Sequence, residues 1–414
     1  MRTYDTYKDS GISWLGLIPS HWDVKRAKVL FNKENRPVLP NDEVVTCFRD
    51  GQVTLRKNRR TEGFTESLKE IGYQGIRKGD LVIHQMDAFA GATGVSDSNG
   101  KGTPVYHVCT PKTDYVNNYY YAHIVRRMGL NGYIQSLYRG IRERSSDFRF
   151  DVFERQFLPV PPLAEQEAIV AYLDSATAEI DKAIASQQRM VELLQERKQI
   201  IINQAVTQGL NPDAPMKPTN IDWLPQIPAH WNLRRMKYSF LFVTDKSNPD
   251  EKKVCLEQIE SWTGKFLDID VQNDGIGIRF KANDILFGKL RPYLAKVHLA
   301  KFGGQAVGDI YVLRCMNLLN SDYAQALLIS KPFIDHIDSS TYGTKMPRTN
   351  WSFMGNVYIP IPPLAEQRSI VDYIGTYAQP INTAIAHCQQ KIELLTERKQ
   401  ILINDVVTGK IKVS

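Results

Sequence analysis

Four short segments of this 414-residue chain combine basic side chains with polar or aromatic ones. Arginine can pair bidentately with guanine O6 and N7, asparagine does the same with adenine, and lysine mainly anchors phosphates. For each residue taken singly, a solvated surface position explains the sequence equally well. Basic loops recur at one aligned position in both halves, which favours binding by the group. The candidate nucleic-acid-binding residues are Arg56, Lys57, Arg59, Arg60, Arg139, Arg142, Arg144, Ser145, Lys289, Arg291, Tyr293, Lys296, Thr344, Lys345, Arg348 and Asn350.

The distribution of charge favours a polyanionic partner for two long segments. The chain carries a net charge of +7, with 24 Lys and Arg against 18 Asp and Glu in residues 1–160. Residues 210–361 carry 18 against 15, whereas residues 161–209 carry 4 against 7. Clustered positive charge attracts nucleic acid, although mild basicity alone is also compatible with having no such partner.

Motifs that would support catalysis, a cofactor or a metal are missing. A phosphate-binding loop needs GxxxxGK[ST], and residues 94–102 lack both its spacing and its hydroxyl. HExxH, GxSxG, GxGxxG and the Asn/Asp-Pro-Pro-aromatic tetrad of methyltransferases that modify amino groups are also absent. Asp250-Glu251-Lys252-Lys253 matches nuclease sites in composition only. We therefore expect no catalytic residue, no metal site and no cofactor in this chain.

Cysteine usage and hydropathy indicate a cytoplasmic protein. The five cysteines are scattered, odd in number and never spaced CxxC, which is typical of a reducing compartment. No apolar run reaches the roughly 18 residues that a membrane span needs, and the first residues lack the apolar stretch of a signal peptide.

Two related stretches, residues 163–208 and 364–408, would have to position the basic loops. A shift of 201 residues superposes them without a gap up to Thr207 and Thr408. In each stretch, eleven positions spaced alternately three and four residues apart form a seam that would face another helix. Apolar residues occupy eight of the eleven seam positions in the first stretch and ten of the eleven in the second. This period predicts two long helices, each packed against another helix. The predicted packing residues are Leu173, Ile180, Ile184, Val191, Leu194, Ile201, Ile374, Ile381, Ile385, Ile392, Leu395 and Leu402.

Three residues depart from the seam pattern. Pro380 is expected either to kink the second helix or to divide it into two. Lys198 and Lys399 are charged seam residues, which either set the register of the helices or lie where the pair separates to receive a partner. The sequence does not decide between these alternatives.

A longer repeat surrounds the helices. Residues 14–22 and 223–231 share the pattern WLxxIPxHW, and we expect their tryptophans to form small aromatic cores. Short strands are predicted at residues 44–48, 53–55, 80–84 and 105–108, helices at residues 115–139 and 323–337, and closing strands at residues 153–160 and 357–361. The predicted organisation is residues 1–160, a first α+β domain; 161–208, the first helix; 209–221, a linker; 222–361, a second α+β domain; and 362–414, the second helix and tail.

With these motifs, the whole chain resembles the specificity subunits of Type I restriction–modification enzymes. The resemblance rests on the two WLxxIPxHW openings, the stretch at residues 284–294, and the two helices that begin PPLAEQ and continue to ERKQI. It implies an α+β fold in which two pseudo-symmetric target recognition domains are separated by two long, antiparallel, coiled-coil-like conserved helices. It also implies a non-catalytic subunit that binds double-stranded DNA, two modification (methyltransferase) subunits and restriction (motor-nuclease) subunits. S-adenosylmethionine would be held by the modification subunits.

The domain arrangement leads to an expectation about the DNA target. Each domain would read one half of a split site, and the paired helices would fix the gap between half-sites at about one helical turn, ~34 Å. The domains differ in sequence, so the two half-sites should differ. An enzyme of unrecognised type acting through Asp250 and Glu251, and a helical scaffold with no nucleic-acid role, are the alternatives.

Overall fold

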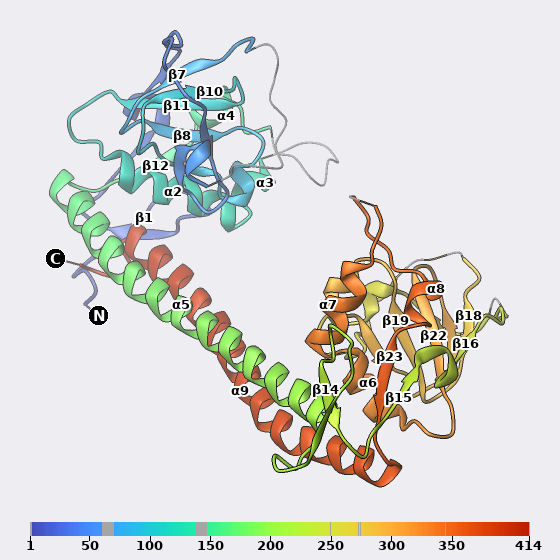
Figure 1. The fold of residues 1–414 in the computed structure, drawn as a ribbon. Coiled ribbons are helices and arrows are strands. Elements are labelled where there is room, and N and C mark those ends of the chain that lie inside the picture. The colour runs from blue at the N-terminus through green and yellow to red at the C-terminus, as the bar shows by residue number, and fades with distance from the viewer. Residues whose placement is uncertain are drawn as a thin grey trace. The chain divides into compact units, whose positions relative to one another are not determined.

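The structure is a computed structural model that describes residues 2–59, 70–137, 147–248, 250–271, 273, 275–343 and 345–413. Contacts divide the chain into two compact units. Unit 1 comprises Met1–Ser186 and Lys391–Ser414, and unit 2 comprises Gln187–Gln390. Each unit therefore contains one β-rich domain and parts of both long helices, α5 and α9 (Figure 1).

The domain of unit 1 is built on a four-stranded antiparallel sheet. Its strand order is β4 (Phe31–Glu34), β11 (Tyr106–Pro111), β8 (Leu81–His84) and β9 (Thr93–Val95). Smaller strand pairs surround this sheet: β1 (Tyr7–Asp9) with β2 (Leu17–Pro19), β3 (Asp23–Arg26) with β12 (Phe157–Val160), β5 (Val45–Cys47) with β6 (Val53–Leu55), and β7 (Gln74–Ile76) with β10 (Gly100–Gly102). The four strands predicted before residue 109 correspond to β5, β6, β8 and β11.

The helices of unit 1 are shorter than the sequence pattern predicts. Residues 115–139 form α2 (Asn118–Leu130) and α3 (Tyr133–Ser136), because Gly132 between them adopts a left-handed φ of 80°. The strand predicted at residues 153–160 covers only β12, since Phe153 ends the short helix α4 (Phe150–Phe153). The remaining helical turns are α1 (Ala27–Leu30), η1 (Arg56–Asn58) and η2 (Ala88–Ala90).

Unit 2 repeats the same frame. Its four-stranded sheet runs β16 (Phe240–Val243), β22 (Ile310–Cys315), β19 (Asp284–Gly288) and β20 (Val297–Leu299). The other strands are β13 (Met216–Pro218) with β14 (Gln226–Pro228), β15 (Asn232–Arg235) with β23 (Tyr358–Ile361), and β17 (Lys253–Val254), β21 (Gly304–Ala306) and β18 (Ile278–Phe280) in a second small sheet. Strand β13 lies within the segment predicted as a linker.

Helical segments of unit 2 flank this frame. Residues predicted as one helix form α6 (Ser321–Leu328) and α7 (Lys331–Ser339), with Pro332 in the first turn of α7. The helix α8 (Trp351–Met354) precedes the closing strand, and the short turns are η3 (Met236–Tyr238), η4 (Leu256–Gln258) and η5 (Pro292–Leu294).

The two long helices are α5 (Leu163–Gln208) and α9 (Leu364–Val407), close to their predicted bounds. In unit 1, Leu173 and Ile169 of α5 share a core with Leu402 and Val406 of α9. In unit 2, the end of α5 packs near the start of α9, as expected for antiparallel helices. The fold is therefore α+β, with two β-rich domains and two long helices packed together.

Helix α9 passes through Pro380 without interruption, so division into two helices is excluded. Proline removes one backbone hydrogen bond inside a helix. Here Pro380 itself is exposed, and its neighbours Ala378 and Ile381 are buried on the opposite face. Packing on both sides of the proline therefore holds the helix together.

The seam positions of both helices face inward. All eleven positions of each seam, including the twelve predicted packing residues, are partly or fully buried. Lys399 donates to Asp181 in unit 1, and Lys198 donates to Asn382 in unit 2. Both charged seam residues thus contact the opposite helix.

The PPLAEQ motif ties the start of each helix to its domain. Gln166 is fully buried; its amide donates to the carbonyls of Tyr115 and Pro161 and accepts from the backbone of Asn117. Gln367 makes the equivalent three hydrogen bonds, with Leu318, Pro362 and Asn320. These bonds satisfy both ends of a buried amide, so the angle between domain and helix is specified by side-chain chemistry.

The glutamate of the same motif contacts the WLxxIPxHW opening. Glu165 accepts from Trp22 Nε1 at 2.7 Å and lies 2.6 Å from His21, whereas Glu366 lies 2.8 Å from His230. Trp22 and Trp231 are completely buried, as predicted for an aromatic core. The two repeated motifs therefore form one joint in each unit.

Candidate nucleic-acid interface

Two separately predicted segments of unit 2 lie side by side. Leu290 forms a β-bridge with Arg348, and the backbone N–H of Arg291 donates to Pro347 O at 2.7 Å. The loop after β19 (residues 289–296) is thus paired with the loop between α7 and α8 (residues 340–350), which projects from the body of unit 2 in Figure 1. We call this pair of segments the paired loops.

Asp309 holds the paired loops together electrostatically. Arg348 donates to both oxygens of Asp309, at 2.9 Å from Nη2 and 3.2 Å from Nε, and Lys289 Nζ lies 3.5 Å from Oδ1. Burial alone would raise the pKa of Asp309, but the hydrogen bond and charge of Arg348, aided by Lys289, lower it. The carboxylate therefore remains ionised and positions two of the candidate cations.

Three other candidate residues of the paired loops face the solvent. Arg291, Tyr293 and Lys345 are exposed, as is the neighbouring Tyr342. Arg291 has a left-handed φ of 49°, and the adjacent turn η5 fixes its direction. Exposed cations beside aromatic side chains are a surface suited to nucleic acid.

Two candidate residues have their polar groups engaged inside unit 2. Lys296 Nζ donates to Leu256 O at 2.6 Å, and the Asn350 side chain caps α8 by accepting from Phe353 N at 2.8 Å. Both residues stabilise the paired loops. Thr344 lies outside the described residues.

In unit 1, the candidate cations of the first basic segment lie on and just after η1. Lys57 pairs with Glu43, and Arg59 pairs with Asp50 while stacking 4.3 Å over the ring of Phe48. Arg56 belongs to the same turn. Arg60, Arg139, Arg142, Arg144 and Ser145 lie outside the described residues.

The two units share one arrangement of strands but carry different residues at some equivalent surface positions. The sequence analysis did not identify these positions. His107 Nε2 lies 2.9 Å from Phe148 O, and Tyr311 donates to Thr349 O at 3.1 Å at the equivalent place. The strand registers also make Lys33 equivalent to Phe242, because these residues pair with Cys109 and Leu313. The sequence did contain a signal for this equivalence. Residues 80–84 align with residues 284–288 at an offset of 204, and applying the same offset to the next strand aligns His107 with Tyr311.

The substitutions change the chemistry of this surface. Lys33 lies 5.3 Å over the ring of Phe150, whereas Phe242 stacks on Trp351 at 4.6 Å. The first arrangement places an ammonium group on the sheet, and the second places an apolar aromatic wall there. Equivalent positions therefore present different chemistry in the two units.

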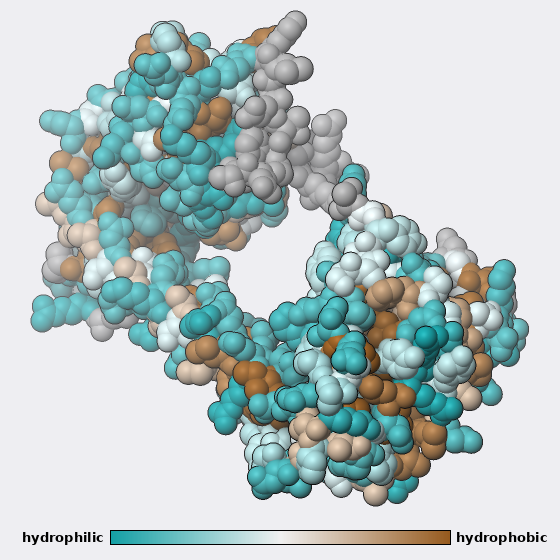
Figure 2. Space-filling model, in the orientation of Figure 1, coloured by the Kyte–Doolittle hydropathy of each residue, from teal (hydrophilic) through white to brown (hydrophobic). Residues whose placement is uncertain are grey.

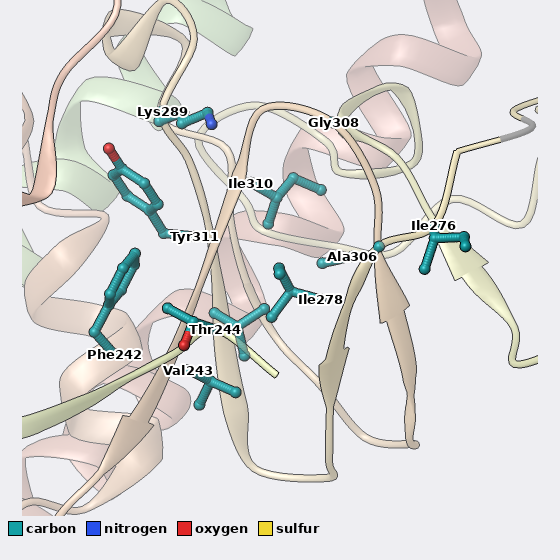
Figure 3. A pocket seen from close by; sticks show the side chains of 12 residues that line it. Phe242, Val243, Thr244, Ile276, Ile278, Lys289, Ala306, Gly308, Ile310 and Tyr311 are labelled. Carbon is teal, nitrogen blue, oxygen red and sulfur yellow. The ribbon is translucent and has the colours of Figure 1, made fainter. Parts of the chain in front are cut away.

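The apolar wall of unit 2 borders a hollow of about 290 Å³ (Figure 3). Phe242 and Tyr311 lie on one side, Ile278, Ala306 and Ile276 lie on the other, and Lys289 stands at one end. Because Lys289 also contacts Asp309, the hollow adjoins the cations of the paired loops.

Other features bear on the alternative functions. Glu251, proposed with Asp250 as a nuclease alternative, is 3.0 Å from Arg279 Nε. Within the part of the chain that the structure describes, no group of three His, Cys, Asp or Glu side chains is placed to hold a metal ion. None of the described helices is both long enough and apolar enough to cross a membrane.

Comparison with known proteins finds one family of similar sequences. Residues 238–394, which include most of the unit 2 domain and much of α9, match the Type I restriction modification DNA specificity domain. Over these residues the chain is therefore similar to the specificity subunits of Type I restriction–modification enzymes.

Individual relatives are similar over a larger part of the chain. The chain is 24% identical over 264 residues to the Type I restriction enzyme EcoDI specificity subunit of Escherichia coli, covering 58% of this chain and 59% of that protein. It is 24% identical over 283 residues to the MjaVIII specificity subunit of Methanocaldococcus jannaschii, covering 63% and 64%. The matched regions thus span about three fifths of the length of these two curated relatives.

A solved structure shares the fold over nearly the whole chain. A chain from a study of complex assembly and conformational transition of the type I R-M system aligns with a TM-score of 0.66 at 15% identity. The alignment covers 95% of this chain and 99% of the other.

Proposed function

We propose that this chain is the DNA specificity subunit of a Type I restriction–modification complex and recognises an asymmetric, bipartite site. The observation that carries the proposal is a duplicated domain frame with different residues at equivalent surface positions, such as Lys33 and Phe242. A shared frame gives both domains the same mode of approach to DNA. Different surface chemistry gives each domain its own half-site.

In this proposal the paired helices set the gap between half-sites. A seam that is buried along both helices resists sliding, and the contacts from Lys399 and Lys198 fix the register. The target recognition domains are residues 1–160 and 222–361, and the helices with their linker are the spacer.

The partners are double-stranded DNA, two modification subunits and the restriction subunits. Apolar side chains on the exposed helix surface support docking of other subunits (Figure 2). Leu193 and Ile200 are exposed on α5, and their repeat equivalents Leu394 and Ile401 are exposed on α9. Repetition of the same outward residues supports two copies of one partner.

The chain itself contributes recognition, and S-adenosylmethionine belongs to the modification subunits. All five cysteines are free, which supports a cytoplasmic location. Genome-wide mapping of modified adenines in a host with the chain and its modification subunits tests the proposal. We expect one split motif with two different halves; modification that follows no split motif, or persists without the chain, would refute it.

A further inference from the structure

The hollow of unit 2 is lined by apolar side chains together with polar groups, among them Thr244, and the Lys289 cation stands at its end beside the cations of the paired loops. Val243, Ile310 and Val312 are almost completely buried in its floor, and Ile276 is 57% exposed at its edge. Its volume of about 290 Å³ lies near the lower limit for pockets that bind small ligands. It can therefore take one planar group, and not a folded peptide segment.

The walls of the hollow are fixed before any ligand arrives. Phe242 stacks on Trp351, the Tyr311 hydroxyl donates to Thr349 O, and Lys289 is held near Asp309. A rigid wall discriminates between ligands by shape, because it does not rearrange to fit a poor one.

Its chemistry selects one of the four bases. Besides the Thr244 hydroxyl, which can donate or accept, the hollow offers apolar surface next to an ammonium donor, so it suits a group with a methyl next to a hydrogen-bond acceptor. Thymine has this combination in its C5-methyl and O4, whereas cytosine and adenine present amino donors, and guanine has no methyl. We propose that the hollow binds an unstacked thymine of the half-site read by unit 2, with its methyl against Ile276 and Ile278 and its O4 toward Lys289.

The base must leave the stack because the binding surface is concave. Base edges lie at the floor of a major groove about 8.5 Å deep, so a stacked base cannot fill a recess in the protein. Proteins that need a whole base in a pocket extrude it, and a weakened base pair lowers the cost of doing so. This inference rests on the proposed function and names a subsite within it.

Modified duplexes test the inference with the unaltered chain and its modification subunits. Each thymine of the unit 2 half-site is replaced in turn by deoxyuridine, which removes only the methyl. We expect about fivefold weaker binding at one position and little change at the others. A mismatch opposite that thymine should strengthen binding severalfold, whereas a base read in the groove would bind more weakly.

Matched variants assign the effect to the hollow. Ile276→Asn should abolish discrimination between thymine and deoxyuridine at that position, and Ile269→Asn, at an exposed isoleucine outside the hollow, should retain it. The inference is overturned by uniform deoxyuridine effects, by weaker binding of the mismatched duplex, or by equal behaviour of the two variants. Loss of all sequence-specific binding by the unaltered chain would instead refute the proposed function.

Discussion

Lys399 of α9 donates to both carboxylate oxygens of Asp181 of α5, at 2.6 and 2.7 Å, whereas its repeat equivalent Lys198 donates to Asn382 at 2.9 Å. Asp181 and Asn382 also correspond in the repeat, so the same cross-helix contact occurs with and without a negative charge. Burial lowers the pKa of Lys198, although nearby Glu260 opposes the shift. These contacts agree with a role of both lysines in setting the helix register.

Restoring the missing carboxylate should stabilise unit 2. We expect Asn382→Asp to raise the free energy of unfolding by about 1 kcal/mol, since the new charge would face a partly desolvated lysine. Asp181→Asn should destabilise unit 1 by a similar amount. Urea unfolding at low and high salt measures both changes, and only the ionic part should weaken with salt. Glu167→Gln, at an exposed position of α5, is the control; an equal effect there would rule out a cross-helix origin.

Lengthening both helices together tests their role as a spacer. One heptad added to each of α5 and α9 adds about 10 Å at 1.5 Å per residue, which is about 3 base pairs of DNA. We expect the gap in the methylated motif to grow by that amount while both half-sites remain the same. A heptad added to one helix alone should shift the seam and abolish modification. An unchanged gap after the double insertion would contradict the spacer model.

The sequence predicted the long helices better than it predicted the domains. The bounds of α5 could be read directly, because a seam residue every three or four positions leaves little freedom of register. Short strands such as β18 and β21 were missed, since three-residue runs contain too little periodicity. The pairing of Arg291 with Pro347 was also unpredictable, because it joins loops more than fifty residues apart through the backbone. The basic residues could be identified, but the role of Asn350 as a helix cap depends on the conformation of its loop.

The buried glutamines of the PPLAEQ motif should be among the costliest side chains to remove. Gln166→Ala deletes three hydrogen bonds and leaves the buried carbonyl of Pro161 and the partly buried backbone groups of Tyr115 and Asn117 without that partner. We expect a loss of about 2–4 kcal/mol in the free energy of unfolding. Gln367→Ala should cost a similar amount, and the exposed Glu167→Ala should cost little. Amide hydrogen exchange at the start of α5 would report the loosened joint; unchanged protection in Gln166→Ala would contradict its proposed role.

Acid should destabilise unit 1 through His107. Burial lowers the pKa of His107 to about 4 from its ordinary value of 6.5, despite the hydrogen bond to Phe148 O. The unfolded state therefore binds more protons between these values, so stability falls as the pH is lowered from 6.5 to about 4, by about 3 kcal/mol in total. His107→Tyr copies Tyr311 of unit 2 and should remove that contribution. Urea midpoints measured between pH 4 and 7 test this.

Two other histidines serve as controls for His107→Tyr. His123 is partly buried, and desolvation lowers its pKa to about 4 as well, so part of the acid sensitivity should persist in His107→Tyr. His387→Gln, at an exposed position on α9, should leave the change of the urea midpoint with pH as it is in the unaltered chain. If the folded His107→Tyr variant kept the same change of the urea midpoint with pH, His107 would not be the cause of the acid sensitivity.

Among the cations of the paired loops, Arg348 should differ from Arg291 and Lys345 in its effect on DNA binding. Arg291→Ala and Lys345→Ala each remove an exposed positive charge, so affinity should fall about three- to tenfold and the salt slope should decrease by about 1 for each phosphate that is no longer neutralised. Arg348→Ala also removes the closer of the two cations that neutralise Asp309, so its carboxylate would repel the phosphates more strongly. We therefore expect a larger loss of affinity, which is partly restored when Asp309→Asn is added.

Affinities of the assembled complex at several salt concentrations measure these effects, with Lys301→Ala as a control at a cation outside the paired loops. If Asp309→Asn gave no recovery, the loss would come from Arg348 itself, and Asp309 would have no electrostatic effect on the bound DNA.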